Sequence, residues 1–370
     1  MSIFAKHNKV LYVERILHFR PTLVQFRQGE LGLADIGYPS LRQVANNLFV
    51  FRYPVWAPIS GRFPLELVTK TIRHRSILRA IRKLEMTDPI MWLARPNMIE
   101  LLDELPRPKL LIYHIVDEYS AYGGQFSEER ERTKTLEQRM LDRADMAVVV
   151  SQKLYQAKHS FNPHTYLVAN GVNYQAYADA LALPNIPAQL QTIPQPRLGY
   201  SGLIGDRLDI GLLKKLAEAY PAWSFVFLGE VNIVHQINAW QAMLALPNVF
   251  YLGKVDAAQV PAYLKGFDVG LMPYAQSKEA DNISPLKLYD YLAAGLPVAS
   301  IAIPAAQEFS DYIQVADAPD LFAVAIENAL TERSSEHASV RREVAKAHTW
   351  EARVEQLSDL IEARLGDAPL

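Results

Sequence analysis

The sequence predicts an α/β protein with two domains, each built around a parallel β-sheet that is covered by helices. The chain has 370 residues, which exceeds the size at which one hydrophobic core usually stops growing. Hydrophobic residues make up 50% of the chain and charged residues 21%, so there is enough apolar material for two cores. Short apolar runs alternate with helical patterns along the whole chain, and this alternation is typical of parallel sheets.

Short runs rich in β-branched and other apolar residues predict the strands. In the first half of the chain they are residues 10–13, 48–51, 89–93, 110–115, 146–150 and 165–168. In the second half they are residues 197–200, 224–228, 249–252, 269–272 and 298–301. Residues 174–196, which are rich in Ala and Pro and poor in charge, predict a linker between the two halves.

The last stretch of the chain, residues 350–365, predicts an amphipathic helix. Its apolar residues recur at helical spacing, so one face should be buried. They are Val354, Leu357, Leu360, Ile361 and Leu365.

Composition excludes several classes of protein. The net charge of −2 argues against a general nucleic-acid binder, which should be strongly basic. The absence of cysteine excludes disulfides and cysteine-ligated metals. The apolar run at residues 10–13 is too short for a signal peptide. The uncharged apolar run at residues 291–306 is interrupted by Gly and Pro and is shorter than the roughly 20 residues of a membrane span. We therefore expect a cytoplasmic protein.

The most informative segment is residues 282–300, where a short helix is predicted to lead into an apolar strand. Ser284 is a favourable N-cap and Pro285 suits the first helical position, while Gly295 and Pro297 end the helix about three turns later. The N-terminus of such a helix attracts anions through its free N–H groups and its dipole.

Two side chains on this helix add chemistry to its N-terminus. Lys287 lies in the first turn and supplies a positive charge for a phosphate. Asp290 follows three residues later on the same face, where a carboxylate could bind sugar hydroxyls. This pairing suits a nucleotide sugar, although a capped helix with a solvated Lys and Asp remains the alternative.

The segment resembles the donor-binding helix of GT-B glycosyltransferases, particularly the broad group related to family four. The resemblance implies that Asp290 holds the ribose hydroxyls of the donor. Many members carry a glutamate eight positions earlier, where this chain has Asn282. A neutral amide can hydrogen-bond a donor sugar but cannot supply charge to an oxocarbenium-like transition state, and the neighbouring Asp281 does not restore the spacing.

Other segments extend the resemblance. Residues 145–151 and 168–173 are similar to the end of a GT-B N-terminal domain, and residues 197–205 to the opening strand and turn of the C-terminal domain. Residues 248–253 and 260–273 resemble the segments that flank the base-binding loop. The first hundred residues match least, and acceptor recognition is expected there.

The resemblance also implies the architecture: two facing Rossmann-like domains with parallel sheets. An N-terminal acceptor-binding domain is expected over residues 1–175, a linker over 176–196 and a C-terminal nucleotide-sugar-binding domain over 197–345. A C-terminal helix within 346–370 should cross back and pack on the first domain.

A glycine-rich turn follows the strand at residues 197–200. Gly202 and Gly205 would let the backbone approach a phosphate closely, although a plain tight turn remains the alternative. In related enzymes an Arg near this turn and a Lys neutralise the departing pyrophosphate, which assigns that role to Arg207 and Lys287. The expected donor-binding residues are Gly202, Gly205, Arg207, Gly253, Lys254, Asn282, Ser284, Pro285, Leu286, Lys287 and Asp290.

The acceptor hydroxyl must lose a proton, which requires a carboxylate or a His. Asp117 and Glu118 follow the buried strand 110–115, and functional groups gather at the carboxyl ends of parallel strands. Similar inverting enzymes use an N-terminal acidic residue or His as the base, so Asp117 and Glu118 are the catalytic candidates, with Asp117 preferred as the base. Alternatively, Asp117 caps a turn and Glu118 is solvated. His114, inside the strand, is interpreted as a core histidine.

No Asp-x-Asp triplet and no His-x-x-x-His pattern occurs in the chain, so no metal and no other cofactor is expected. No Gly-x-Gly-x-x-Gly motif follows residues 10–14 either, which argues against a dinucleotide oxidoreductase.

A basic amphipathic segment spans residues 62–83, with seven Lys or Arg against one acid, Glu66. Such a segment could rest on the anionic inner face of the cell membrane, and the neighbouring residues 54–61 could dip into the interface. A solvated helix with its apolar side in the core is the alternative.

The sequence therefore predicts a metal-independent glycosyltransferase of bacterial polysaccharide synthesis, with a nucleotide-diphosphate sugar as donor and a saccharide or lipid-linked saccharide as acceptor. Asn282 and Asp117 favour inversion slightly. Two alternatives stay open: a sugar-nucleotide epimerase of the same fold, and a transferase-like binding subunit without catalysis.

Overall fold

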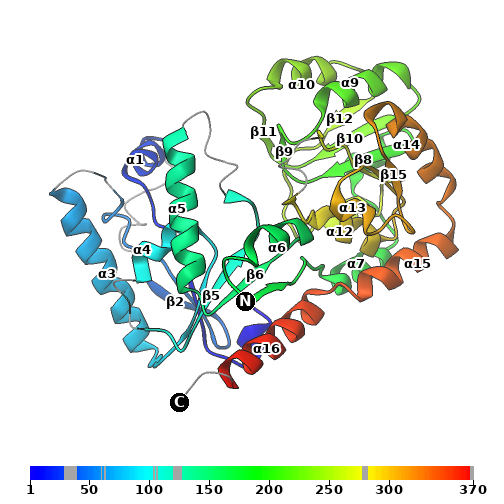
Figure 1. Ribbon diagram of the computed structural model, residues 1–370. Helices are drawn as coiled ribbons and strands as arrows, with labels where there is room; N and C mark the ends of the chain where they lie inside the picture. The colour runs from blue at the N-terminus through cyan, green and yellow to red at the C-terminus, as the bar shows by residue number, and fades with distance from the viewer. Residues whose placement is uncertain are drawn as a thin grey trace. The chain divides into compact units, whose positions relative to one another are not determined.

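The computed structural model describes residues 1–28, 40–59, 61, 64–102, 105, 107–119, 127–276 and 282–366. The chain forms two compact units (Figure 1). The first comprises Met1–Tyr113, Thr135–Asp145 and the chain end from Arg364, and the second comprises His114–Lys134 and Met146–Ala363.

The first unit contains a three-stranded sheet of order β1-β3-β2. Strand β1 (Val10–Val13) pairs parallel to β3 (Leu48–Phe51), and β2 (Leu41–Ala45) pairs antiparallel to β3. A second parallel pair joins β4 (Ile90–Leu93) to β5 (Leu110–Ile115). The helices associated with these strands are α1 (Phe19–Arg27), α3 (Leu65–Lys83), α4 (Ile99–Leu102) and α5 (Ser127–Arg143), the last of which continues from one unit into the other.

The second unit is built on a six-stranded parallel sheet of order β12-β10-β8-β13-β14-β15. Its strands are β8 (Arg197–Ser201), β10 (Ser224–Leu228), β12 (Val249–Tyr251), β13 (Val269–Met272), β14 (Val298–Ile301) and β15 (Gln314–Ala316). Two further parallel pairs join β6 (Met146–Val149) to β7 (Thr165–Leu167) and β9 (Ile204–Gly205) to β11 (Val231–Asn232).

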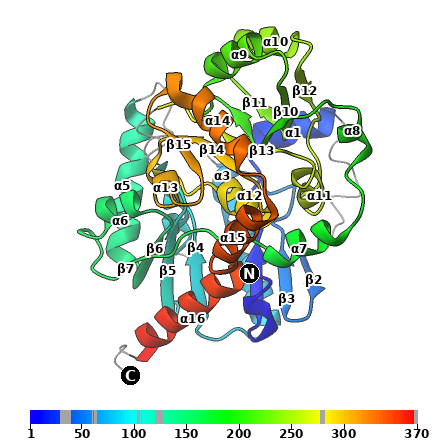
Figure 2. The same cartoon turned by 90° about the vertical axis from the view of Figure 1, so that its right-hand side faces the viewer.

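The strand order runs outward from β8 in both directions, so helices lie on both faces of the six-stranded sheet. Right-handed crossovers put α9 (Ile210–Ala219) and α10 (Ile237–Leu244) on one face and α12 (Leu286–Ala294) on the other. The remaining helices of this unit are α6 (Gln152–Lys158), α7 (Tyr174–Ala182), α8 (Ala188–Gln191), α11 (Val260–Leu264), α13 (Pro304–Gln307), α14 (Phe322–Thr331), α15 (Ser335–Lys346) and α16 (Trp350–Gly366). Helices α15 and α16 follow one another at the end of the chain (Figure 2).

The expected strands are confirmed within one residue at either end, because each is a compact run of mainly apolar residues. The sequence analysis missed β2, β9, β11 and β15, which are very short or carry polar residues. Residues 174–196, where a linker was expected, contain α7 and α8, and their Tyr177 and Leu190 join the hydrophobic core of the second unit. The predicted C-terminal helix is α16, in which Leu357 and Ile361 are buried.

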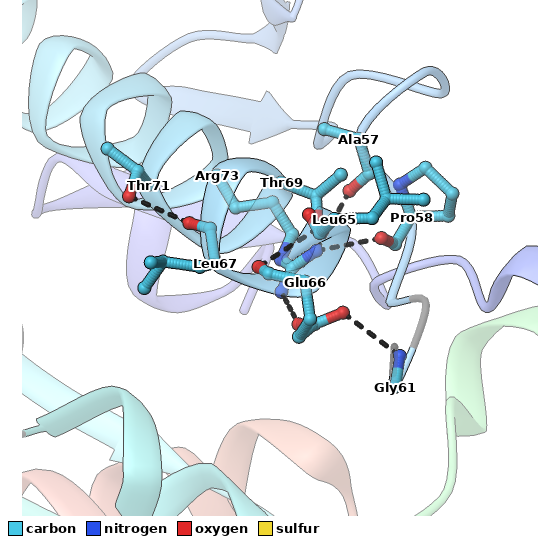
Figure 3. Close-up of polar contacts among 9 residues, drawn as sticks. All are labelled: Ala57, Pro58, Gly61, Leu65, Glu66, Leu67, Thr69, Thr71 and Arg73. Atoms are coloured by element: carbon cyan, nitrogen blue, oxygen red, sulfur yellow. Dashed lines mark hydrogen bonds and ion pairs between the residues drawn. The ribbon is translucent and has the colours of Figure 1, made fainter. Parts of the chain in front are cut away.

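The basic segment forms α3, and its first turns are held by polar contacts (Figure 3). The buried Arg73 pairs with Glu66 and donates to the carbonyl oxygens of Ala57 and Pro58 at 3.1 and 2.9 Å. Glu66 also accepts from the N–H of Gly61 at 3.2 Å. One of the seven basic residues is therefore internal, and Arg62 lies outside the described residues.

Every helix in the described ranges lacks the length or the apolar character that a membrane crossing requires.

Candidate functional site

Helix α12 ends as predicted but begins one residue later. Gly295 adopts a left-handed conformation (φ 74°), and its N–H bonds to the carbonyl oxygen of Leu292, as helix C-caps commonly do. The N-cap is Pro285, without a side-chain cap, so the expectation that Ser284 caps the helix is wrong. The Ser284 hydroxyl lies 3.5 Å from the Tyr289 hydroxyl instead.

The chain before α12 is fixed by two side chains from neighbouring segments. The Ser151 hydroxyl donates to the carbonyl oxygen of Asn282 at 2.8 Å, and the Asn170 amide donates to that of Ser284 at 2.7 Å. Ser151 follows β6 and Asn170 follows β7. The sequence analysis identified both segments but assigned these residues no role, although their position after the carboxyl ends of parallel strands was an available signal.

Lys287 lies among three tyrosines. Its ammonium donates to the Tyr274 hydroxyl at 2.8 Å and lies 4.8 Å from the ring centroid of Tyr200 and 5.1 Å from that of Tyr274. Burial works to lower the pKa of Lys287, but the oxygens of Tyr200, Tyr274 and Tyr291 outweigh it and raise this pKa. The side chain therefore remains a cation, supported by cation–π and hydrogen-bond contacts.

The glycine turn after β8 reaches Lys287. A Cβ atom on Gly202 would lie 3.3 Å from Cε of Lys287. Gly202 has φ of +132° and Gly229 has φ of +149°, and a Cβ atom on Gly229 would lie 1.9 Å from the carbonyl oxygen of Gly202. Glycine is thus required at both positions, and the structure brings the turn and the cation together as the sequence analysis expected.

Arg207 and Asp117 form an ion pair, with Nη2 of Arg207 at 2.8 Å from Oδ2 of Asp117. The side chains are 38% and 23% exposed respectively, so the pair is accessible to solvent. Burial raises the pKa of Asp117 above its ordinary value, and the charge of Arg207 opposes that rise. Asp117 also accepts from the N–H of Glu118 at 3.0 Å, so it makes a local turn contact as well.

Glu118 pairs with Lys158 of α6 at 2.9 Å. The exposed fractions of the two side chains are 17% and 9%, which is a mostly buried ion pair. The solvated Glu118 that the sequence analysis held as an alternative is not observed. Breaking such a pair leaves an uncompensated charge, so Glu118 has a structural role here.

Asp290 is directed toward α7. Burial raises the pKa of its carboxyl to about 6, against the opposing contributions of the Tyr177 hydroxyl and Lys287. His114 is a largely buried histidine whose pKa is lowered by burial to about 4, in agreement with its interpretation as a core residue.

The contacts of four other expected donor-binding residues, Gly205, Gly253, Lys254 and Leu286, are as follows. Gly205 pairs with Asn232 in the β9–β11 ladder. Gly253 has φ of +77°, and its carbonyl oxygen accepts from the N–H of Gly229 at 2.8 Å. Lys254 forms an exposed ion pair with Glu230 at 2.8 Å. Leu286, the first residue of α12, is 50% exposed.

Comparison with known proteins identifies related chains. A glycosyl transferase-like family profile matches residues 210–359. TuaH of Bacillus subtilis (strain 168), a protein assigned to teichuronic acid biosynthesis as a glycosyltransferase, is 29% identical over 286 residues, covering 72% of this chain and 70% of TuaH.

Two solved structures share the fold over nearly the whole chain. Sucrose-phosphate synthase from Thermosynechococcus elongatus has a TM-score of 0.72 at 17% identity, covering 99% of this chain and 92% of that one. HepE of Anabaena, solved with UDP and glucose, has a TM-score of 0.63 at 13% identity, covering 96% of this chain and 100% of that one. These likenesses confirm the predicted GT-B fold.

We predict that Asp290→Asn removes one contribution to the pH dependence of stability between about pH 4 and pH 6. The folded-state pKa of Asp290 is about 6, above the roughly 3.9 of an unfolded chain. The folded state then binds more protons, so the free energy of unfolding falls as pH rises from about 4 to about 6. Asp290→Asn should be more stable at pH 7 by on the order of 1–3 kcal/mol.

Denaturant titrations at pH 4, 5, 6 and 7 measure this difference. The control is Asp359→Asn, which changes an exposed carboxylate on α16. An equal stability difference between wild type and Asp290→Asn at all four pH values would show that Asp290 keeps an ordinary carboxyl pKa.

Proposed function

We propose that this chain, which is a glycosyltransferase with the GT-B fold, moves a sugar from a nucleotide-diphosphate donor to a saccharide or lipid-linked saccharide acceptor in bacterial polysaccharide synthesis. The family profile and the similarity to TuaH support transfer chemistry and this class of pathway. HepE, with bound UDP and glucose, supports a nucleotide-sugar donor.

The observation that carries the proposal is the position of Lys287. Its ammonium is enclosed by uncharged tyrosines and lies beside the Gly202 turn. A cation that contacts tyrosine hydroxyls and rings in this way is suited to a ligand that brings its own negative charge. A diphosphate next to a glycine turn and a helix N-terminus fits that requirement.

In the proposed mechanism, Lys287 and Arg207 stabilise the charge that develops on the departing diphosphate. The N-terminal N–H groups of α12 add a further partial positive charge. These groups are in place before the reaction, so they need little reorganisation. Protein cations would thereby perform the role that a divalent metal performs in other transferases, and we propose that no metal is needed.

Asp117 is the proposed base, and its ion pair with Arg207 keeps the carboxyl deprotonated and thus able to accept a proton. Arg207 favours the ionised carboxylate, while burial keeps its basicity above that of a free Asp. A donor diphosphate would compete for Arg207 and release Asp117 to accept a proton from the acceptor hydroxyl. Direct base-assisted attack of this kind inverts the configuration at the sugar.

The comparisons do not favour the alternatives. An epimerase of the same fold would act on the donor alone, whereas the similar TuaH is assigned as a glycosyltransferase. The argument for a non-catalytic binding subunit depends on Asn282, which stands where many related enzymes have a glutamate. The side-chain amide of Asn282 could still hydrogen-bond the donor sugar. Isomer formation from a sugar nucleotide without acceptor would identify an epimerase, and transfer to any acceptor would exclude a purely binding role.

We also propose peripheral contact with an anionic membrane through the first unit. Apolar side chains at the start of α3 and in the preceding loop are exposed, and exposed Lys and Arg residues follow along the same helix. The apolar residues are Trp56, Leu65, Leu67 and Val68, exposed by 56, 47, 60 and 55%. The basic residues are Lys70, Arg75, Arg79, Arg82 and Lys83.

Lys287→Ala is expected to reduce turnover about 10²- to 10³-fold, because one lost donor to a developing negative charge typically costs about 2.7–4 kcal/mol. The measurement is sugar transfer under single-turnover conditions, with circular dichroism to verify folding. The matched control is Lys215→Ala, which removes an exposed cation from α9. Near-normal rates in a folded Lys287→Ala protein would reject the assignment.

Asp117→Asn should lower transfer by at least about 10²-fold while donor binding is retained or tightened, since Arg207 loses its intramolecular partner. Rapid-quench kinetics and calorimetric titration of the donor separate the two effects. Asp311→Asn, at an exposed site, is the control. Wild-type transfer by Asp117→Asn would remove Asp117 from the mechanism.

The wild type should bind phosphatidylglycerol vesicles at low salt and not phosphatidylcholine vesicles. Each Lys or Arg near an anionic surface contributes about 1 kcal/mol, so a joint Arg75→Glu and Arg79→Glu change should weaken binding at least about tenfold. Arg139→Glu, on the exposed side of α5, should change it little. Vesicle co-sedimentation tests this, and absence of wild-type binding would refute the membrane contact.

A further inference from the structure

Asp206 lies between Gly205 and the proposed phosphate-binding Arg207, and its carboxylate holds a neighbouring turn. Its two oxygens accept from three successive backbone N–H groups, those of Val234, His235 and Gln236, at 2.8, 3.0 and 3.2 Å. Partial burial works to raise the pKa of Asp206, but these three N–H groups outweigh it and lower the pKa. The carboxylate is therefore ionised and makes charge-assisted bonds.

The side chain of Gln236 joins the same two segments, since it reaches from the segment 234–236 to the backbone that follows Arg207. Its amide nitrogen donates to the carbonyl oxygen of Leu208 at 2.8 Å, and its amide oxygen accepts from the N–H of Ile210 at 3.2 Å. Residues on both sides of Arg207 are thus bonded to the segment 234–236. We call Asp206 and Gln236 together the turn clamp.

The backbone of Arg207 is held from its other side by residues 273–275. The N–H of Ala275 donates to the carbonyl oxygen of Arg207 at 2.9 Å, and the N–H of Asp209 donates to that of Pro273 at 2.9 Å. Leu208 and Tyr274 form an antiparallel bridge between these two contacts. Tyr274 is the residue whose hydroxyl accepts from Lys287 of α12, so this ribbon carries Arg207 and the tyrosine that contacts Lys287.

The hydrogen bonds of the turn clamp lie near the protein surface and do not hold a hydrophobic core together. Asp206 is half-buried, and Val234 is 68% exposed, so water could satisfy the three N–H groups if the carboxylate were absent. What water cannot do is fix the backbone of residues 206–210 in one conformation. Precise placement of charged groups is worth much more to a binding or catalytic site than to overall stability.

We infer that Asp206 and Gln236 are positioning residues, which fix the backbone of Arg207 and thereby hold its guanidinium in place for the donor diphosphate. This inference rests on the proposed function, because it assigns the clamp a purpose only if Arg207 and Lys287 bind the diphosphate. The clamp acts through Arg207 and does not itself contact the donor.

A double-mutant cycle between Asp206 and Arg207 tests the inference, with UDP as the probe in calorimetric titrations. Asp206→Ala should weaken UDP binding about three- to thirtyfold in the wild-type background. In the Arg207→Ala background the same change should cost less than about twofold, since no side chain remains to be positioned. Asp206→Asn, which keeps one acceptor oxygen, should fall between wild type and Asp206→Ala and covers the case in which the alanine variant does not fold.

Asp209→Ala is the matched control. Asp209 caps α9 by accepting from the N–H of Leu212 at 2.8 Å, so its loss should lower the melting temperature while changing UDP affinity equally in both Arg207 backgrounds. Equal effects of Asp206→Ala in both backgrounds, or no effect, would overturn the positioning role while leaving the proposed function intact. If neither UDP nor GDP binds the wild type, or if Arg207→Ala and Lys287→Ala both bind UDP normally, the proposed function fails and the inference with it.

Discussion

One buried cation, Lys287, constrains how the elements of the second unit are arranged. Lys287 is surrounded by the rings and hydroxyls of Tyr200, Tyr274 and Tyr291, and each ring comes from a different element around the six-stranded sheet. Tyr200 lies on β8, Tyr274 follows β13, and Tyr291 lies on α12 itself. Desolvating a charge is costly unless polar or aromatic groups replace the water, so these elements must be aligned together for Lys287 to remain charged.

Tyr291 shows how that alignment is enforced. Its hydroxyl accepts from the N–H of Ser201 at 2.9 Å, and its ring occupies the space beside Gly270, where a Cβ atom would lie 2.6 Å from a ring carbon. The helix is thereby fixed against both β8 and β13. Ser151 and Asn170 fix the chain before the helix, so the N-terminus of α12 has little freedom to move relative to the sheet.

Sequence reasoning succeeded where a local pattern determines the structure. The strands of the second unit are short apolar runs, and the end of α12 follows from the conformational freedom of Gly295. The family resemblance and the GT-B fold were also confirmed. Both had been recognised from motifs between residues 197 and 300, each of which is a short contiguous segment. The start of α12 was misplaced by one residue because Ser284 is held by Asn170, which is 114 positions away.

Contacts between distant parts of the chain could not be predicted in this way. Nothing in the spacing of Asp117 and Arg207 indicates an ion pair across 90 positions, and the same is true of Glu118 and Lys158 across 40. The roles of Ser151, Asn170 and Asp206 likewise depend on which loops meet after folding. Local motifs identified the region of the candidate site. The hydrogen bonds and ion pairs within it could be found only from the three-dimensional structure.

The packed pair of Gly202 and Gly229 limits how the proposed donor-binding turn could be redesigned. Neither position tolerates a side chain, since a Cβ atom on Gly229 would collide with the backbone of Gly202 and both residues have positive φ. Leu203, between the turn glycine and β9, is 57% exposed. A library that aims to alter donor preference should therefore keep both glycines and vary position 203, where new side chains can be accommodated without rebuilding the loop.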